Sequence, residues 1–425
     1  MRILLLLVIF FGGVLWGQNV DPFSPTVSRQ ESEQIQEALA TFEASPEEAI
    51  KVLAKLTPEK TGAAVDFTLG NLYFQSQTYE KAKKAYERAL VKFPAFRNAK
   101  INLGRIYLLL EDPLKAIALY QELVRDGIAD SETYLLLGHA LLMESQAVSA
   151  ESAYRQGLLL DQELLEAKQG LLNALMIQER YEEAVFLSHE LLQADPTRRD
   201  FWAARANAEL SLGKNDLALT SLEQARRLGS ADGEMLGILG ELYLAEGASE
   251  QAMERFTAAF ETETRSVQRQ VQAIRAMLAS GYPEDAEQLL GLLEKRLAEN
   301  PEVGSELGEG TVLKIKTRLL IAQAKENEAK EYLKELLRIN PLDGESLLMY
   351  SAILHGEERS DESLLVLERA ARVSGFEADS LTRQAMIHVE QNQYALAITL
   401  MERAQVFEER AQVTAYLMQL RRMIE

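Results

Sequence analysis

The stretch AAVDFTLGNLYFQSQTYEKAKKAYERALVKFPAF, residues 63–96, decides the fold that this sequence predicts. Counted from Ala63 as position 1, Gly70 holds position 8, Ala82 holds position 20 and Tyr86 holds position 24. The same arrangement recurs every 34 residues through residue 300, in seven repeats with no insertion or deletion. A period of this length is typical of an array in which each repeat is a pair of helices stacked on the next pair.

Three positions carry the packing rule of these repeats. Two antiparallel helices approach closely only where a side chain is small, and a large side chain fills the neighbouring gap. The repeat at 165–198 has Leu172 at position 8, so we expect looser or shifted packing there. Position 20 is Ala82, Ala116, Ala150, Ala184, Ala218, Ala252 and Ala286; position 8 is Gly70, Gly104, Gly138, Leu172, Ala206, Gly240 and Ile274; position 24 is Tyr86, Tyr120, Tyr154, Ser188, Leu222, Phe256 and Leu290.

Further helices are expected before these seven repeats. Residues 31–62 predict a degenerate first helix pair, with helices over 33–43 and 46–56. Ser45-Pro46 begins the second helix with an N-cap residue followed by proline at the first helical position, where its missing N–H costs nothing.

More helices are expected after residue 300. There the frame slips by nine residues, and residues 301–309 are interpreted as an inserted loop in preference to a domain boundary, because repeats of the same length resume beyond them. Three further repeats follow at 310–343, 344–377 and 378–411, and residues 412–425 are expected to form a helix that covers the end of the stack.

This pattern resembles the tetratricopeptide repeat family, whose consensus has Leu-Gly at positions 7–8, Tyr at 11, Ala at 20 and 27, an aromatic residue at 24 and Pro at 32. The match is strongest in residues 63–96 and 233–266. The resemblance implies an all-α fold, a right-handed α-α superhelical solenoid of about ten to eleven helix pairs with a C-terminal capping helix. It also implies a protein that binds other proteins or peptides.

The first residues indicate export. Arg2, an apolar run over residues 3–11 and the small residues up to Gly17 have the layout of a secretory signal peptide (1–17), with cleavage expected after Gly17. Leu15 is bulkier than the usual residue at that place, so an uncleaved membrane anchor is the alternative. Residues 18–30 are expected to form a tether, and the location expected for the protein is the bacterial periplasm or the secreted space.

Composition excludes several function classes. The 45 Lys and Arg residues against 65 Asp and Glu residues give a net charge of −20, which argues against binding nucleic acid or an anionic lipid surface. Cysteine is absent from the sequence, which excludes disulfides, thiolate metal sites and a cysteine nucleophile.

No segment of the sequence carries a catalytic motif. His189-Glu190-Leu191-Leu192-Gln193 comes near to the H-E-x-x-H zinc motif, but Gln193 stands where the second histidine would bind the metal. We therefore expect no catalytic residue, no cofactor and no metal, and hence a protein that is not an enzyme.

The candidate binding site follows from the family resemblance, because the first helix of each repeat lines the concave face through positions 2, 5, 9 and 12. Position 9 is polar throughout, and position 12 beside it is apolar (Phe74, Leu108, Leu142, Met176, Leu210, Leu244, Leu278 and Ile321). Such a stripe suits an extended peptide or a partner helix; the alternative is that position 12 is core and position 9 is merely solvated. The groove residues that we predict are Phe67, Asn71, Phe74, Asn102, Arg105, His139, Asn173, Asn207, Glu241, Arg275 and Arg318.

One group within the family, the carboxylate-clamp proteins, grips the C-terminus of a peptide with asparagines and cations. Asn71 and Asn102 match the two asparagines of that clamp, whereas Phe67, Glu132 and Leu136 stand where its cations belong. Binding of a terminal carboxylate is therefore not expected, although the two asparagines are candidates for holding a peptide backbone.

Two functions fit the sequence. The first is a non-enzymatic interaction scaffold of the cell envelope or secreted space. The second is a regulatory or recruiting subunit of an envelope enzyme complex, in polysaccharide synthesis or export or in proteolysis, with catalysis supplied by the partner. The partner would be a protein or peptide, and self-association is compatible with the sequence.

Overall fold

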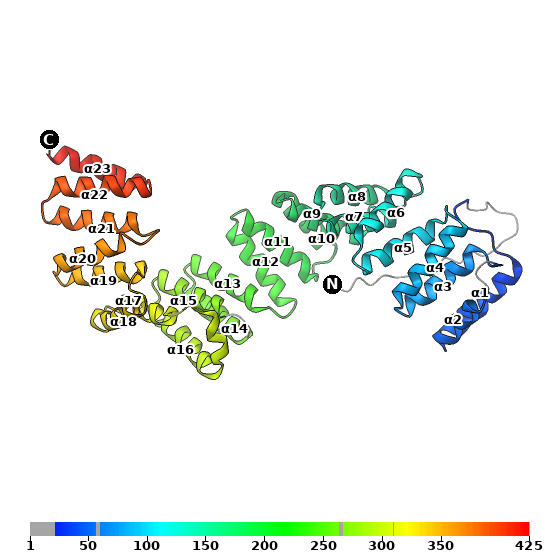
Figure 1. Cartoon of the computed structure of the whole chain (residues 1–425), viewed down its shortest axis with the longest axis horizontal. Helices are drawn as coiled ribbons and strands as arrows, with labels where there is room; N and C mark the ends of the chain where they lie inside the picture. The colour runs from blue at the N-terminus through cyan, green and yellow to red at the C-terminus, as the bar shows by residue number, and fades with distance from the viewer. Residues whose placement is uncertain (1–21, 57–59, 263–266, 309, 425) are drawn as a thin grey trace. The chain divides into compact units, whose positions relative to one another are not determined.

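The computed structural model describes residues 22–56, 60–262, 267–308 and 310–424, so the expected signal peptide (1–17) lies outside the described residues. All regular secondary structure in these ranges is α-helix or 3₁₀ helix, and these ranges contain no strand (Figure 1). The chain divides into two compact units, residues 1–214 and 215–425, and each is described by itself.

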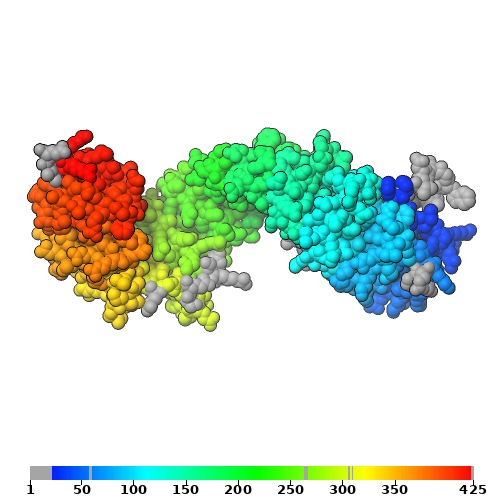
Figure 2. Space-filling model, turned by 45° about the horizontal axis from the view of Figure 1, so that its top comes forward, coloured from blue at the N-terminus to red at the C-terminus, as the bar shows by residue number. Residues whose placement is uncertain are grey.

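Unit 1 is a row of helix pairs in which each helix packs against the next along the chain (Figure 1). In the space-filling view the surface of unit 1 runs in sequence order from blue to green (Figure 2). Its helices are α1 (Arg29–Phe42), α2 (Pro46–Ala54), α3 (Ala63–Gln75), α4 (Tyr79–Lys92), α5 (Arg97–Leu109), α6 (Pro113–Arg125), α7 (Ser131–Met143), α8 (Ala147–Leu160), α9 (Leu165–Ile177), α10 (Tyr181–Ala194) and α11 (Arg199–Ser211).

Unit 2 continues the same order of elements. Its helices are α12 (Asn215–Arg227), α13 (Gly233–Ala245), α14 (Ser249–Thr262), α15 (Gln268–Ala279), α16 (Pro283–Glu299), η2 (Pro301–Glu306), α17 (Thr311–Ala322), α18 (Glu326–Ile339), α19 (Gly344–Gly356), α20 (Ser360–Ala370), α21 (Glu377–Glu390), α22 (Tyr394–Phe407) and α23 (Ala411–Ile424). The expected all-α superhelical repeat fold is confirmed.

The turn inside each helix pair repeats as regularly as the helices do. At position 15 of every 34-residue repeat the backbone has a positive φ, and glycine occupies that position in three repeats, as Gly213, Gly247 and Gly281. In the other repeats a residue with a side chain takes the left-handed conformation, with φ between 56° and 62°: Gln77, Glu111, Ser145, Glu179, Ala324, Glu358 and Asn392. The three repeats after the slip in frame therefore form the same turn as those before it.

The small residue at position 8 meets the large residue at position 24 of the same repeat. A Cβ atom built on Gly70 would lie 2.6 Å from Cε1 of Tyr86, so only glycine allows the ring to lie there. The same contact joins Gly104 to Tyr120, Gly138 to Tyr154, and Gly240 to Phe256. Tyr86, Tyr120 and Tyr154 are all fully buried, which confirms that this pair of positions holds the two helices together.

The repeat at 165–198 keeps the rule in reverse. Leu172 and Ser188 are 2% and 0% exposed, so the large side chain lies on the first helix and the small one on the second. Helices α9 and α10 nonetheless approach each other less closely than α3 and α4 or α7 and α8 do, in agreement with the looser or shifted packing expected there.

Helix ends differ slightly from those expected. Helix α1 begins at Arg29, within the expected tether, because Ser28 and Glu31 form a capping box in which each accepts a hydrogen bond from the other's backbone. Pro46 is the first residue of α2 as expected, but the Ser45 side chain makes no capping hydrogen bond. The expected loop at 301–309 contains the 3₁₀ helix η2 over Pro301–Glu306.

No helix within the described ranges combines the length and the apolar character that crossing a membrane requires.

Candidate functional site

The position-9 residues of unit 1 lie on the first helices of five successive pairs, at Asn71, Arg105, His139, Asn173 and Asn207. Their surroundings differ sharply along the row. The first two are held in hydrogen bonds within the protein, and the last two are exposed to solvent.

Asn71 and Asn102 belong to a network that joins three repeats. The Asn71 Oδ1 accepts hydrogen bonds from the Tyr86 hydroxyl at 2.8 Å and from Asn102 Nδ2 at 3.0 Å. The Asn102 Oδ1 accepts from Arg105 Nη1 at 3.1 Å, and the Arg105 guanidinium also pairs with Glu132. Asn102 and Arg105 are only 8% and 6% exposed, so this part of the row stabilises the stack and is not free to bind a peptide.

The two phenylalanines predicted in the groove are also part of the core. The Phe67 ring lies 4.7 Å from the ring of Phe96 and 5.8 Å from that of Tyr86, measured between centroids. The Phe74 ring meets Tyr79 edge-on at 5.8 Å. Both are half-buried, as are most of the position-12 residues, which pack against the core clusters of their repeats. The structure therefore favours the alternative that position 12 is core.

His139 occupies an intermediate place in the row. Its ring is half-buried and meets the Tyr154 ring edge-on, with 5.7 Å between centroids. Burial lowers the pKa of His139, and the nearby Glu166 carboxylate opposes that shift only in part. The Tyr154 hydroxyl is buried without a hydrogen-bond partner, although the equivalent Tyr86 hydroxyl bonds to Asn71.

Asn173 on α9 and Asn207 on α11 are the exposed members of the row. Each has an exposed carboxylate on the same helix, Glu166 and Asp200, at position 2 of its repeat. The Gln169 side chain donates to Asp200 at 3.3 Å, which connects the two helices. This part of unit 1 presents amides and carboxylates to solvent, a surface suited to an extended peptide with basic side chains.

Three of the predicted residues lie in unit 2, on α13, α15 and α17. Glu241 and Arg275 are exposed, and Arg318 is half-buried, with its guanidinium 2.5 Å from the Glu345 carboxylate on the next repeat.

Two hollows among the described residues of unit 1 lie between second helices, where no groove residue is predicted. The larger, about 660 Å³, lies between α8 and α10 above α9 and is lined by Leu158, Leu171, Leu175 and Phe186 with acidic and basic residues around them. Phe186 is 73% exposed. A signal for it exists in the sequence, because position 22 is polar or small in the other complete repeats before the slip: Lys84, Ala118, Ser152, Thr220, Glu254 and Gln288.

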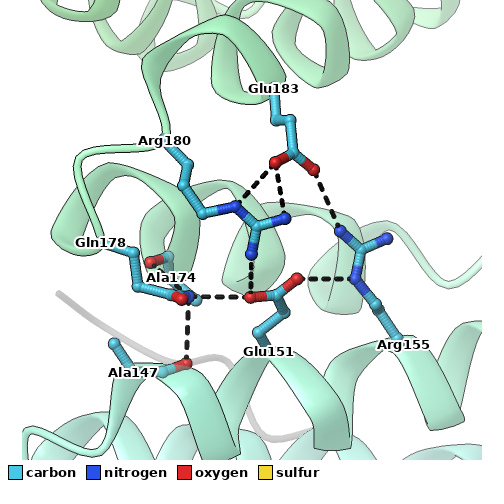
Figure 3. Close-up of polar contacts among 7 residues, drawn as sticks. All are labelled: Ala147, Glu151, Arg155, Ala174, Gln178, Arg180 and Glu183. Atoms are coloured by element: carbon cyan, nitrogen blue, oxygen red, sulfur yellow. Dashed lines mark hydrogen bonds and ion pairs between the residues drawn. The ribbon is translucent and has the colours of Figure 1, made fainter.

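A polar cluster lies beside this hollow and ties α8 to the turn between α9 and α10 (Figure 3). Glu151 accepts hydrogen bonds from Arg155 at 2.8 Å, Gln178 at 2.9 Å and Arg180 at 2.5 Å. Arg180 also donates to Glu183 at 2.6 Å. Burial of Glu151 opposes ionisation, but these hydrogen bonds outweigh it and lower the pKa of Glu151. The cluster is explained by its role in joining two repeats.

The smaller hollow, about 260 Å³, lies in the equivalent place between α2 and α4 above α3. Leu53, Val65 and Leu69 in its lining are at most 5% exposed. Its rim differs from that of the larger hollow, because it is formed by the cations Lys81, Lys84 and Arg88.

The near-zinc motif places His189 beside Gln193 and not beside a second histidine. Gln193 Nε2 lies 3.1 Å from His189 Nε2 on the exposed side of α10. Within the described part of the chain, no group of three or more histidine or carboxylate side chains is arranged to hold a metal ion.

A sequence profile described as tetratricopeptide repeat matches residues 67–131 and 203–263. This match supports the resemblance of the chain to tetratricopeptide repeat proteins. Proteins built from this repeat generally act as non-catalytic scaffolds that bind proteins or peptides. No curated protein sequence matches the chain.

Several solved structures resemble the chain. A tetratricopeptide repeat protein from Parabacteroides merdae is 18% identical over 62% of this chain and 98% of that one, with a TM-score of 0.42. YrrB, described as a repeat protein with an unusual peptide-binding site, is 18% identical over 46% of this chain and 93% of its own, with a TM-score of 0.38. The APC/C hetero-tetramer Cut9–Hcn1 is 14% identical over 94% of this chain and 97% of that chain, with a TM-score of 0.37.

Proposed function

We propose that this protein is a non-enzymatic scaffold that holds an extended peptide segment of a partner protein along α7, α9 and α11. The observation that carries the proposal is the contrast within the position-9 row. The side-chain oxygen of Asn71 accepts hydrogen bonds from Tyr86 and Asn102. At the equivalent position of later first helices, the side-chain amides of Asn173 and Asn207 are exposed. An amide can donate to and accept from a peptide backbone at once.

The charges next to these amides indicate the kind of peptide. Glu166 and Asp200 are exposed on the same helices, and the protein as a whole is acidic. The Arg198 guanidinium lies 2.6 Å from the Asp200 carboxylate and compensates part of its charge. Glu166 is therefore the carboxylate with the greater capacity to attract a cation. The segment that fits is extended, carries lysine or arginine, and needs no free C-terminus.

The test uses peptides selected from a displayed random library against the wild-type chain. Calorimetry then compares the wild type with the double variant N173A/N207A. Because each neutral hydrogen bond contributes about 0.5–1.5 kcal/mol, the variant is expected to bind roughly 5- to 100-fold more weakly.

The matched control is Q156A/Q193A, which removes two exposed amides from the second helices α8 and α10. It should bind as the wild type does. Equal affinity of all three proteins for every selected peptide would rule out the proposed surface.

We also propose that the protein is exported, on the strength of Arg2 and the apolar run over residues 3–11. A fusion of residues 1–30 to a reporter that is active only outside the cytoplasm tests this. Activity should appear with the native segment and disappear when Leu5 and Leu6 are replaced by aspartate. An inactive native fusion would refute export.

A further inference from the structure

We propose that unit 1 binds a second copy of this chain through its second helices: Phe186 of one copy enters the hollow between α2 and α4 of another. Near Phe186 the cations Arg155 and Lys168 are already paired, so the charges left unpaired there are carboxylates, whereas the exposed charges at the rim of the hollow are lysines.

Phe186 projects from α10 where other repeats have polar or small residues. It is 73% exposed, far more than the other aromatic residues of the repeats that build the core. Glu182, Glu183 and Glu190 lie on the same helix and are exposed, as is Glu163 before α9. A large exposed apolar side chain inside a ring of charges is typical of the anchor residue of an interface.

The receiving hollow has the size and the lining that an aromatic ring needs. Its volume is about 260 Å³ and its lining includes Leu53, Val65, Leu69 and Tyr73. An apolar cavity of about 150 Å³ is enough to hold a benzene ring. The volume of the hollow is therefore sufficient for a phenyl ring.

The charges of the two surfaces are complementary. Lys81 and Lys84 are exposed at the rim of the hollow, and Arg88 beside them is already paired with Asp66 at 2.8 Å. Around Phe186, Glu183 pairs with Arg180 and Glu190 pairs with Lys168, whereas Glu163 and Glu182 have no ion pair within the described residues. Opposite charges favour this pairing, and like charges oppose the meeting of two Phe186 surfaces.

The Phe186 that enters the hollow must come from a second copy of the chain. Helices α5 to α9 separate α4 from α10 within unit 1, so Phe186 cannot reach the hollow of its own chain. Because the overall charge of −20 opposes association, a specific local attraction is required, and it should weaken with salt.

The test measures the mass of the full chain in solution by analytical ultracentrifugation as its concentration rises. Variant K81E/K84E makes the rim acidic, and variant E163K/E182K makes the surroundings of Phe186 basic. Neither substitution removes an ion pair within the structure described. Each variant alone should stay monomeric, because both of its surfaces then carry the same sign of charge.

An equimolar mixture of the two variants should associate again, because each surface of one now meets the opposite charge on the other. Variant F186S should weaken association of the wild type roughly 10- to 100-fold, through loss of one buried aromatic side chain. At 1 M salt, where the Debye length is about 3 Å, association should fall.

A wild type that remains monomeric at every concentration would overturn the proposal. So would a mixture that fails to associate while circular dichroism shows both variants folded, or an F186S variant that associates as the wild type does. The peptide-binding variant N173A/N207A should associate normally, so the result is independent of the proposed function.

Discussion

Asn71 and Asn173 occupy the same position of their repeats, yet one is committed to the fold and the other is free. Asn71 is flanked by Tyr86 at position 24 of its own repeat and by Asn102 at position 6 of the next, and both donate to it. For Asn173 those positions hold Ser188 and Ala204. Alanine has no donor, and the Ser188 hydroxyl donates to the carbonyl of Val185 on its own helix. The residues around position 9, more than its own identity, decide whether it binds inward or outward.

The largest effect is expected from R105A, which removes the charged centre of the network at the committed end. Because hydrogen bonds to charged groups contribute about 1.5–3 kcal/mol, stability should fall by about 2 kcal/mol. Urea unfolding followed by circular dichroism measures it. The control R275A removes an exposed arginine at the same repeat position and should leave the urea midpoint unchanged. Equal losses in both variants would contradict the distinction.

A pair of conservative changes tests the tyrosines. Y86F removes the hydroxyl that donates to Asn71, and should cost about 1 kcal/mol. Y154F removes a buried hydroxyl that has no partner, and should be neutral or slightly stabilising. The two thermal midpoints should therefore shift by different amounts; identical shifts would show that the Asn71 hydrogen bond adds nothing.

His139 should make the stability of the folded protein depend on pH. Its pKa is lowered by burial, so below the usual histidine value of about 6.5 the unfolded chain takes up the proton more readily than the folded chain. The neutral ring therefore stabilises the protein above that pH, and the contribution is lost as pH falls through the lower pKa of the folded state. Glu166 is the carboxylate that opposes this loss.

Variant H139N should remove this dependence and place an amide beside the Tyr154 hydroxyl, as Asn71 is placed beside Tyr86. The expected gain at low pH is about 1 kcal/mol. Urea midpoints of both proteins between pH 5 and pH 8 measure it; parallel curves would mean that His139 is not the group that titrates.

The smallest effect on stability is expected at the free end of the row. N173A/N207A should change the free energy of unfolding by less than about 0.5 kcal/mol, as is usual for surface substitutions. Thermal unfolding checks this. A larger loss would show that these amides also serve the fold.

The sequence was enough to predict the helix pairs, because the period and the small residues at positions 8 and 20 depend only on spacing. It was not enough to predict the network around Asn102, because that network requires the side chains of Tyr86 and Arg105 to meet the asparagines across neighbouring repeats. Leu172 at position 8 correctly indicated the less close approach of α9 to α10, because that effect also depends on spacing alone.

The hollows between second helices were missed because the predicted groove was sought only on first helices. Phe186 has a signal in the sequence, because position 22 is polar or small in the other repeats before the slip. The place of Lys81 and Lys84 at the rim of a hollow is different, because the hollow exists only once α2, α3 and α4 are packed together. The cluster around Glu151 joins two turn residues, Gln178 and Arg180, that no other repeat combines at these positions.

The turns inside the helix pairs leave this protein with room for improvement by engineering. In seven of them, among the described residues, a side chain is held in the left-handed backbone region. Such a conformation costs about 1 kcal/mol for residues other than glycine and asparagine. Each repeat contacts mainly its neighbours, so gains from glycine at Gln77, Ser145 or Ala324 should accumulate along the array. A heat-resistant form of the chain could then be made without touching either proposed binding surface.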